Sequence, residues 1–268
     1  MSAPYYDAHN HLQDEWLRPH REQVFADLSH LDVLRGAVVN GTQESDWEEV
    51  AALARSFSWV RPAFGLHPWY VKQRSPDWLD ALQRQLDANP RASIGEIGLD
   101  RWIEGFDLDD QRAVFLAQLR LAATRNAPVT IHCLQAWGAL GDALRAEPVP
   151  ARGFLLHAYG GPAEMAGVLA KRGAYFSFNG AHLDSRKQAR REVFRAIPLE
   201  RLLVETDAPA MPSPAEHSPF TLPANADGTP VNHPANITAT YAALAELRGL
   251  PLETLAAQIE ENFHRLFD

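Results

Sequence analysis

Histidines and carboxylates recur in this sequence at one kind of position, directly after a short apolar run. His9 and His11 close YYDAHNHL, and Glu96 closes ASIGE. The same position is occupied by the other candidates, which are His67, His132, His157 and Asp207. Side chains at the same end of successive strands meet at one edge, and imidazoles and carboxylates are the usual ligands of catalytic divalent metals. The pattern therefore predicts a metal centre.

Six of these side chains form a candidate ligand set. His9 and His11 are two residues apart, so on a strand both imidazoles point to the same face. A catalytic zinc ion usually takes three protein ligands, so six ligands suit two ions with one bridging carboxylate. The predicted metal ligands are His9, His11, Glu96, His132, His157 and Asp207. We expect two divalent ions, with Zn, Mn, Co or Ni favoured by the imidazoles and Mg less suited.

The chemistry expected of such a centre is hydrolysis. A hydroxide between two divalent ions is a nucleophile near neutral pH, and the ions also clamp the leaving oxygen. Asp207 could both bind metal and accept the proton of the attacking water. Such a hydroxide attacks a carbonyl as readily as it attacks phosphorus, so the ligands alone do not show which type of bond the protein cleaves.

Eight apolar runs, separated by helical or loop segments, are typical of buried parallel strands. Helical spacing is clearest over 44–56, 109–125, 163–172, 235–249 and 251–267. The eight expected strands are 5–10, 35–40, 59–65, 92–97, 128–133, 153–158, 174–179 and 201–206. This alternation predicts an α/β fold, a (β/α)8 TIM barrel forming one domain over 1–268. A dinucleotide-binding fold would need a glycine-rich turn after the first strand, and DAHNHLQDE has none.

The composition restricts the classes of partner. The formal charge of −9 argues against a stable basic surface for nucleic acid, although bound cations could still make a site locally positive. Cys133 is the single cysteine, so no internal disulfide can form. The sequence also has no signal-peptide pattern and no apolar run of roughly 18 residues. We therefore expect a cytoplasmic protein with no membrane segment, while the oligomeric state is left open.

Seven motifs, in order along the chain, together resemble the TatD-related metal-dependent hydrolases, the TatD DNase family. They are DAHNH at 7–11, GLHP at 65–68, GEIGLD at 95–100, IHC at 131–133, HAYGG at 157–161, ETDAP at 205–209 and NFHRLF at 262–267. The resemblance implies a barrel with two metal ions that hydrolyses phosphodiester bonds of DNA, often as a 3′-to-5′ exonuclease. The substrate would be a nucleic-acid end or a small phosphodiester.

The resemblance also implies a role for each residue. His9, His11 and Asp207 would hold one ion, His132 and His157 the other, with Glu96 bridging. His67 would contact the substrate phosphate, which makes Asp207, Glu96 and His67 the predicted catalytic residues. The three lysines, Lys72, Lys171 and Lys187, lie outside the strand-end motifs. A carbamylated lysine bridge is therefore excluded, and Glu96 must bridge.

The chain departs from the family pattern at three places around the site. Trp69 stands where HPH is common, Cys133-Leu134-Gln135 replaces a serine and a basic residue, and the Pro-rich loop 208–234 has no Arg or Lys. These changes remove polar or cationic groups from a phosphate-binding rim. The alternative is accordingly a two-metal hydrolase of ester or amide bonds, for example an aminoacyl-ester deacylase. A metal-binding protein without catalysis is disfavoured because all six ligands are present.

Several nearby side chains have more than one interpretation. Trp69, Trp102 and Trp137 follow strand-end motifs and could stack on a base, but packing against loops is favoured. Asn179 is expected to line the pocket, although the following Gly180 also suits a simple turn, and Asp100 is expected to fix loop geometry. Loop 208–234 is too long for a simple connection, so it is either functional or a surface excursion.

Overall fold

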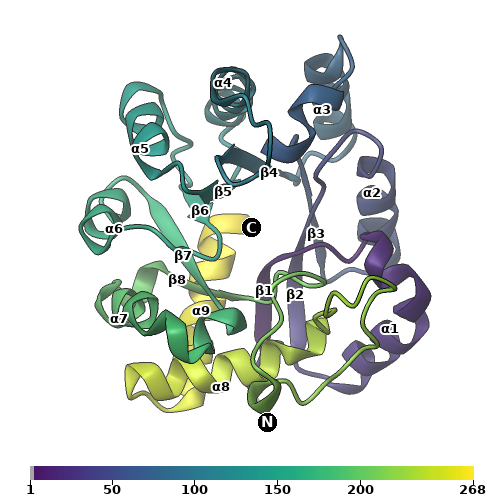
Figure 1. Cartoon of the computed structure of the whole chain (residues 1–268), viewed down its shortest axis with the longest axis vertical. Coiled ribbons are helices and arrows are strands. Elements are labelled where there is room, and N and C mark those ends of the chain that lie inside the picture. Colours follow the sequence, from purple (N-terminus) through teal and green to yellow (C-terminus); the bar gives the residue numbers. More distant parts are fainter. Residues whose placement is uncertain (1–2) are drawn as a thin grey trace.

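The structure, a computed structural model, describes residues 3–268. Its eight strands form one parallel sheet in sequence order, with helices around the outside (Figure 1). The strands are β1 (Tyr5–Asn10), β2 (Leu34–Asn40), β3 (Val60–Phe64), β4 (Ser93–Asp100), β5 (Val129–Leu134), β6 (Phe154–Leu156), β7 (Ala174–Asn179) and β8 (Leu202–Glu205). All eight predicted strands are present, with β4 longer and β6 shorter than expected.

The sheet closes on itself just beyond the end of β8. The backbone N–H of Asp207 donates to the carbonyl of His9 at 2.9 Å, and the N–H of His11 donates to the carbonyl of Ala208 at 2.7 Å. The predicted (β/α)8 barrel is therefore confirmed. Strands enclosed by helices are buried on both faces, which explains why they are continuous apolar runs rather than alternating ones.

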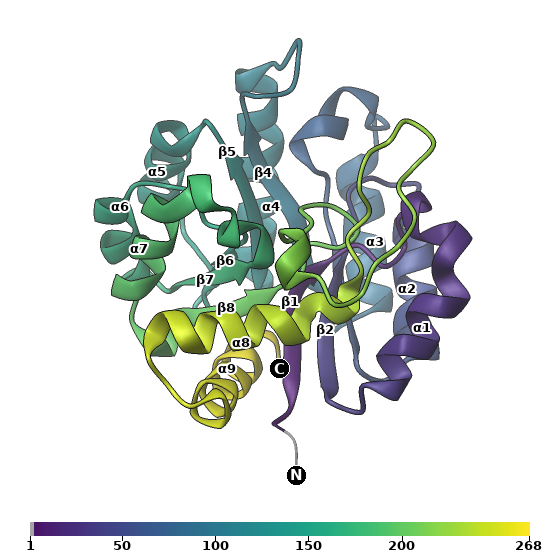
Figure 2. The same cartoon turned by 60° about the horizontal axis from the view of Figure 1, so that its bottom comes forward.

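An outer layer of helices covers the barrel. It consists of α1 (Arg21–His30), α2 (Trp47–Ser56), α3 (Trp78–Ala88), α4 (Leu108–Arg125), α5 (Trp137–Ala146), α6 (Ala163–Ala170), α7 (Gln188–Ala196), α8 (Ile237–Arg248) and α9 (Leu252–Phe267). The five predicted helical segments correspond to α2, α4, α6, α8 and α9. The last two pack against each other and across β1 and β8 (Figure 2). In α9, Leu255, Ile259 and Phe263 form the buried stripe that helical spacing predicts.

Loop 208–234 begins at the barrel mouth, where Pro209, Ala210 and Met211 line a pocket, and runs beside the barrel toward α1 before α8 begins (Figure 1). Its two arms meet through an antiparallel bridge between Thr221 and Asn232, and Asn232 N–H donates to Pro209 O at 2.8 Å. Its far end contacts α1, where His233 Nε2 lies 3.2 Å from Asp27 Oδ2. The loop is thus anchored at both ends. In the described chain, no helix is long and apolar enough to cross a membrane.

Candidate metal centre

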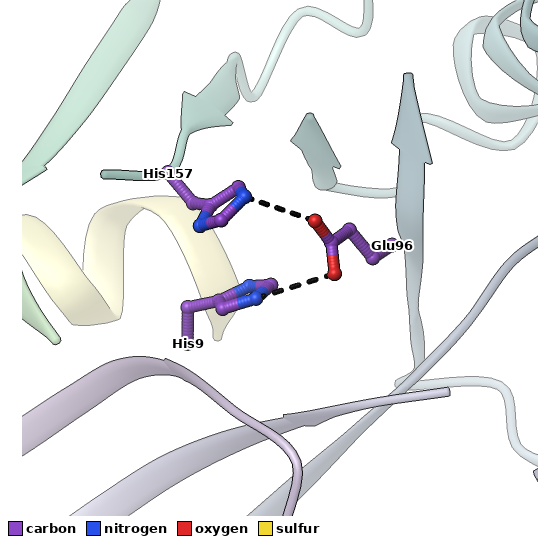
Figure 3. Close-up of side chains that lie close together, drawn as sticks. All are labelled: His9, Glu96 and His157. Carbon is purple, nitrogen blue, oxygen red and sulfur yellow. Dashed lines mark ion pairs between the residues drawn. The ribbon is translucent and has the colours of Figure 1, made fainter. Parts of the chain in front are cut away.

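The predicted strand-end residues meet in one cluster at the C-terminal end of the barrel, and Glu96 lies at its centre. Glu96 Oε1 is 2.9 Å from His157 Nε2 and 3.1 Å from His132 Nδ1. Glu96 Oε2 is 3.3 Å from His11 Nε2 and 3.4 Å from His9 Nε2. Figure 3 shows His9 and His157 approaching opposite oxygens of this one carboxylate. Each oxygen therefore faces its own pair of histidines.

Asp207 completes the group on the His9 side. Its Oδ1 lies 3.3 Å from His9 Nε2 and 3.4 Å from His11 Nε2. Asp207 follows β8 with a φ of 54°, a left-handed conformation that short polar side chains tolerate. The side-chain nitrogens and oxygens of His9, His11 and Asp207 lie within 4.8 Å of one another, as do those of His9, Glu96 and His157. Such spacing is suited to ligands around a common ion.

The hydrogen-bond partners assign the ring protons of two histidines. His11 Nδ1 lies 2.8 Å from the carbonyl of Asn40, and His132 Nε2 lies 2.8 Å from Asp100 Oδ2. Each of these nitrogens must donate, so the other nitrogen of each neutral ring presents a lone pair to Glu96. Lone pairs that face carboxylate oxygens in a buried site repel unless a proton or a metal cation lies between them. The donor set therefore fits divalent metal ions.

His67 joins the same cluster but offers a different group. Its Nδ1 accepts the backbone N–H of Trp69 at 3.2 Å, and burial lowers the pKa of His67 to about 4. The neutral ring consequently carries its proton on Nε2, which lies 3.5 Å from Glu96 Oε1. The spacing of His67, Glu96 and His132 would also allow a metal ligand, but a protonated nitrogen has no lone pair to give. His67 is better placed as a hydrogen-bond donor.

The histidines around Glu96 counteract the effect of burial on its pKa. Burial raises the pKa of Glu96, but the surrounding histidines, His157 foremost, outweigh that effect and hold it well below its usual range. The Asp100 carboxyl behaves similarly, since its hydrogen bond from His132 offsets burial and lowers its pKa to about 2. Both groups are therefore carboxylates at neutral pH, as metal ligation and histidine orientation require.

A second layer of carboxylates holds the histidines, and sequence reasoning largely missed it. Asp100 fixes its loop as predicted, since Oδ1 accepts the N–H of Trp102 at 2.6 Å, but Oδ2 also accepts from His132. On the other side, Glu205 Oε1 lies 3.6 Å from His157 Nδ1. Both carboxylates lie at strand ends, so the same positional signal could have identified them.

The prediction that Asn179 lines the pocket is wrong. The Asn179 side chain is fully buried behind the cluster, and its Nδ2 donates to Glu205 Oε1 at 3.3 Å and to Thr206 O at 3.2 Å. It points to the second layer because Glu205 on the neighbouring strand attracts its amide. Asn179 thus helps to hold Glu205, which faces His157.

A pocket of about 440 Å³ opens above the ligand cluster. Among the described residues that line it there is no arginine or lysine, whereas Asp14 and Glu15 are present. Its aromatic lining comprises Trp16, Trp69, Tyr70 and Trp102. The packing role favoured for Trp102 is wrong, because this side chain is 63% exposed. Trp137 does pack, with its ring 4.8 Å from that of Tyr159.

Comparison with known proteins gives consistent similarities. Residues 6–268 match the family model described as TatD related DNase. The 3′-5′ ssDNA/RNA exonuclease TatD of Escherichia coli (strain K12) is 31% identical over 242 residues, which cover 87% of this chain and 88% of that protein. The uncharacterized metal-dependent hydrolase YjjV of the same strain is 29% identical over 233 residues, covering 86% and 85%.

The fold comparison agrees with the sequence comparison. The crystal structure of YJJV, a TatD homolog from Escherichia coli K12, superposes with a TM-score of 0.87 at 28% identity. The alignment covers 98% of this chain and 97% of that chain. Sequence and fold are therefore both shared over nearly the whole length.

Proposed function

The chain belongs to the TatD-related DNase family of metal-dependent hydrolases, and on that premise we propose that it cleaves phosphodiester bonds at nucleic-acid ends with two metal ions. One observation carries the proposal. The two oxygens of Glu96 face separate histidine pairs, His9 with His11 and His132 with His157. A carboxylate in that position can bridge two ions, as hydrolytic two-metal centres require.

The residues divide into two ligand groups around Glu96. His9, His11 and Asp207 would hold one ion, and His132 and His157 would hold the other. Imidazole-rich ligands favour zinc, manganese, cobalt or nickel over magnesium. When bound, such ions supply an activated water nucleophile and polarise the oxygens of the scissile phosphate.

The side chains around the ligands have their own tasks. His67 Nε2–H donates to a non-bridging oxygen of the phosphate, and burial, which lowers the pKa of His67 to about 4, favours the neutral ring. Asp207 directs Oδ1 at His9 and His11, and Oδ2 accepts the proton of the attacking water. Asp100 holds His132 with Nδ1 directed at Glu96. This network positions the reacting groups before the substrate binds.

Three substrate classes test the proposal. The protein is loaded separately with each candidate metal and assayed on bis(p-nitrophenyl) phosphate, a single-stranded oligonucleotide labelled at either end, and a panel of carboxylic esters and amides. We expect phosphodiester turnover and stepwise loss of nucleotides from one end. Turnover of esters or amides with no phosphodiester cleavage, whatever the metal, would contradict the proposal.

Asp207→Asn is the matched control for that assay. It keeps the size of the side chain and removes its charge, so the activity of the protein itself must fall. Nuclease activity that survives in this variant would identify a contaminating enzyme. The assay then provides no support for the proposal until purer protein is measured.

A further inference from the structure

The pocket above the metal ligands lacks the groups that bind a chain of phosphates. Asp14 and Glu15 contribute negative charge at its rim, and the described lining has no cation to oppose them. Two cations of the adjoining segments point elsewhere. Arg101 lies over the ring of Phe106 at 5.8 Å, and Lys72 Nζ donates to Gly105 O at 2.7 Å. A long polyanion would therefore gain little from counterion release here and would meet charge of its own sign.

The same pocket instead presents exposed aromatic faces. Trp69 is 39% exposed and Trp102 63% exposed, and their ring centroids are 6.3 Å apart with the planes tilted by 32°. Large apolar side chains that remain open to water beside a reaction site usually mark a binding surface. Aromatic faces bind nucleobases by stacking, with little dependence on base identity.

Trp69 is held in place before any substrate binds. Its backbone N–H donates to His67 Nδ1 at 3.2 Å, and its indole Nε1–H donates to Asp100 Oδ2 at 2.8 Å. Asp100 Oδ2 also accepts from His132, so the tryptophan shares an acceptor with a predicted metal ligand. The aromatic face is therefore fixed relative to the reaction centre, which lowers the entropic cost of binding.

We propose that Trp69 and Trp102 form a stacking subsite for the base next to the scissile bond, and that the enzyme prefers short substrates with few phosphates. The inference rests on the proposed phosphodiesterase function and names its substrate class: dinucleotides and comparably short nucleotide diesters. Stacking of the base on the two tryptophans supplies the binding free energy that contacts with several phosphates supply in other nucleic-acid-binding proteins. Asp14 and Glu15 disfavour the additional phosphates of a longer chain.

Chain length and salt provide the first test. We compare kcat and KM of the metal-loaded protein for a thymidine dinucleotide and a thymidine dodecamer, from low to high salt. We expect the dinucleotide to have the higher kcat/KM at low salt, and the KM of the dodecamer to fall as salt screens Asp14 and Glu15. A dodecamer whose KM rises steeply with salt would overturn the inference but leave the phosphodiesterase function intact. Absence of cleavage of either substrate would count against the function itself.

Substitutions at the rim provide the second test. Trp102→Ala should raise the KM for the dinucleotide about tenfold and lower kcat much less, while Trp102→Phe restores most of the affinity. Phe106→Ala is the matched control, an aromatic residue of the same loop, 39% exposed, that does not line the pocket. The double variant Asp14→Asn with Glu15→Gln should lower KM for the dodecamer several-fold and leave the dinucleotide unchanged. An unaltered KM in Trp102→Ala would overturn the stacking subsite.

Discussion

The two ends of the barrel differ in how their charged side chains are placed: those at the C-terminal end are buried, and those at the N-terminal end are partly exposed. At the C-terminal end, histidines and carboxylates are buried with their acceptor atoms facing one another, as around Glu96. At the N-terminal end, a hollow of about 600 Å³ is lined by Arg61, Arg91, Arg125 and Arg152, with Asp87 and Asp268 between them. There two of the four arginines form ion pairs, since Arg61 Nε lies 2.7 Å from Asp268 Oδ1, and Arg125 pairs with Asp87.

This difference shows that positive charge alone does not locate the chemistry of the protein. The arginines are partly exposed and screened by water, so their ion pairs contribute little to stability and leave nothing unsatisfied. The buried carboxylates at the other end have, among the described residues, only histidines as charged partners and no arginine or lysine, which favours a bound cation there. Substitutions at the C-terminal end should therefore change metal binding and catalysis, and those at the N-terminal end only stability.

The largest effect is expected from Glu96→Gln. Glutamine keeps one neutral oxygen and replaces the other with an NH2 group, so the proposed bridge loses its charge, and kcat should fall by about a thousandfold or more together with the metal content. Elemental analysis and initial rates measure the two effects. Glu104→Gln, an exposed residue of the following loop, is the control. Two metals per chain in Glu96→Gln would show that Glu96 does not bridge.

His67→Ala should lower kcat by about a hundredfold without loss of metal, if the residue donates to the phosphate, as we propose, and is not a ligand. His67→Asn retains an N–H donor and should recover part of the rate. Metal content, again by elemental analysis, separates the two roles of this residue. Loss of an ion from His67→Ala would place His67 among the ligands and remove it from substrate contact.

Asp100→Asn should weaken metal binding by about 10- to 100-fold, since His132 loses the carboxylate that orients its ring. Competition with a metal-binding dye measures the affinity. Asp109→Asn, at an exposed position in the first turn of α4, is the matched control. Equal affinity in wild type and Asp100→Asn would mean that the bond between His132 Nε2 and Asp100 Oδ2 does not orient the ligand.

Sequence reasoning located the cluster because parallel strands of one barrel end at one edge. A histidine or carboxylate at the end of an apolar run, such as His132 or Asp207, therefore lies at that edge. The same rule found Glu96 at the centre, although β4 continues for four residues beyond it to Asp100. Strand ends are therefore informative because topology, rather than local propensity, fixes where the side chains meet.

The rest of the site depends on contacts that no periodicity encodes. Asp100 was identified as a loop residue, but its link to His132 arises only when β4 and β5 pair. The exposure of Trp102 likewise depends on the path of an irregular loop. Among the helices, α1, α3, α5 and α7 were missed; in α1 only Val24 and Leu28 are buried, too few to mark an apolar stripe.

His182 gives a further contrast at the C-terminal end of the barrel, because it is buried among apolar rings and not in the predicted ligand cluster. Phe178 and Phe194 lie beside it, and burial, assisted by Lys187 and Arg190, lowers its pKa to about 3. The unfolded chain, with the ordinary pKa of 6.5, therefore binds the proton first as the pH falls. Stability is complete above the unfolded value and is lost progressively below it.

The loss of stability that His182 causes can be measured by comparing wild type with a variant that cannot titrate at this position. Between about pH 7 and about pH 5, wild type should lose about 2 kcal/mol more unfolding free energy than His182→Asn, which cannot titrate. Asparagine can still accept the N–H of Asn179 that His182 Nδ1 accepts at 3.2 Å. Urea denaturation at the two pH values gives both numbers. Parallel losses in the two proteins would show that His182 is not the group responsible.

The smallest effect is expected at the arginine-lined hollow. Arg61→Ala removes a two-point contact with Asp268, but the side chains are 21% and 32% exposed, so the expected loss of stability is at most about 1 kcal/mol. The loss should shrink further in high salt, which screens the pair. Urea denaturation at two salt concentrations measures it, with the more exposed Arg91→Ala as a control.

Hydrolysis rates should be unchanged in both variants, because the hollow lies at the opposite end of the barrel from Glu96. A lowered kcat/KM in Arg61→Ala alone would mean that the two ends are coupled, and the separation of stability from catalysis drawn above would not hold.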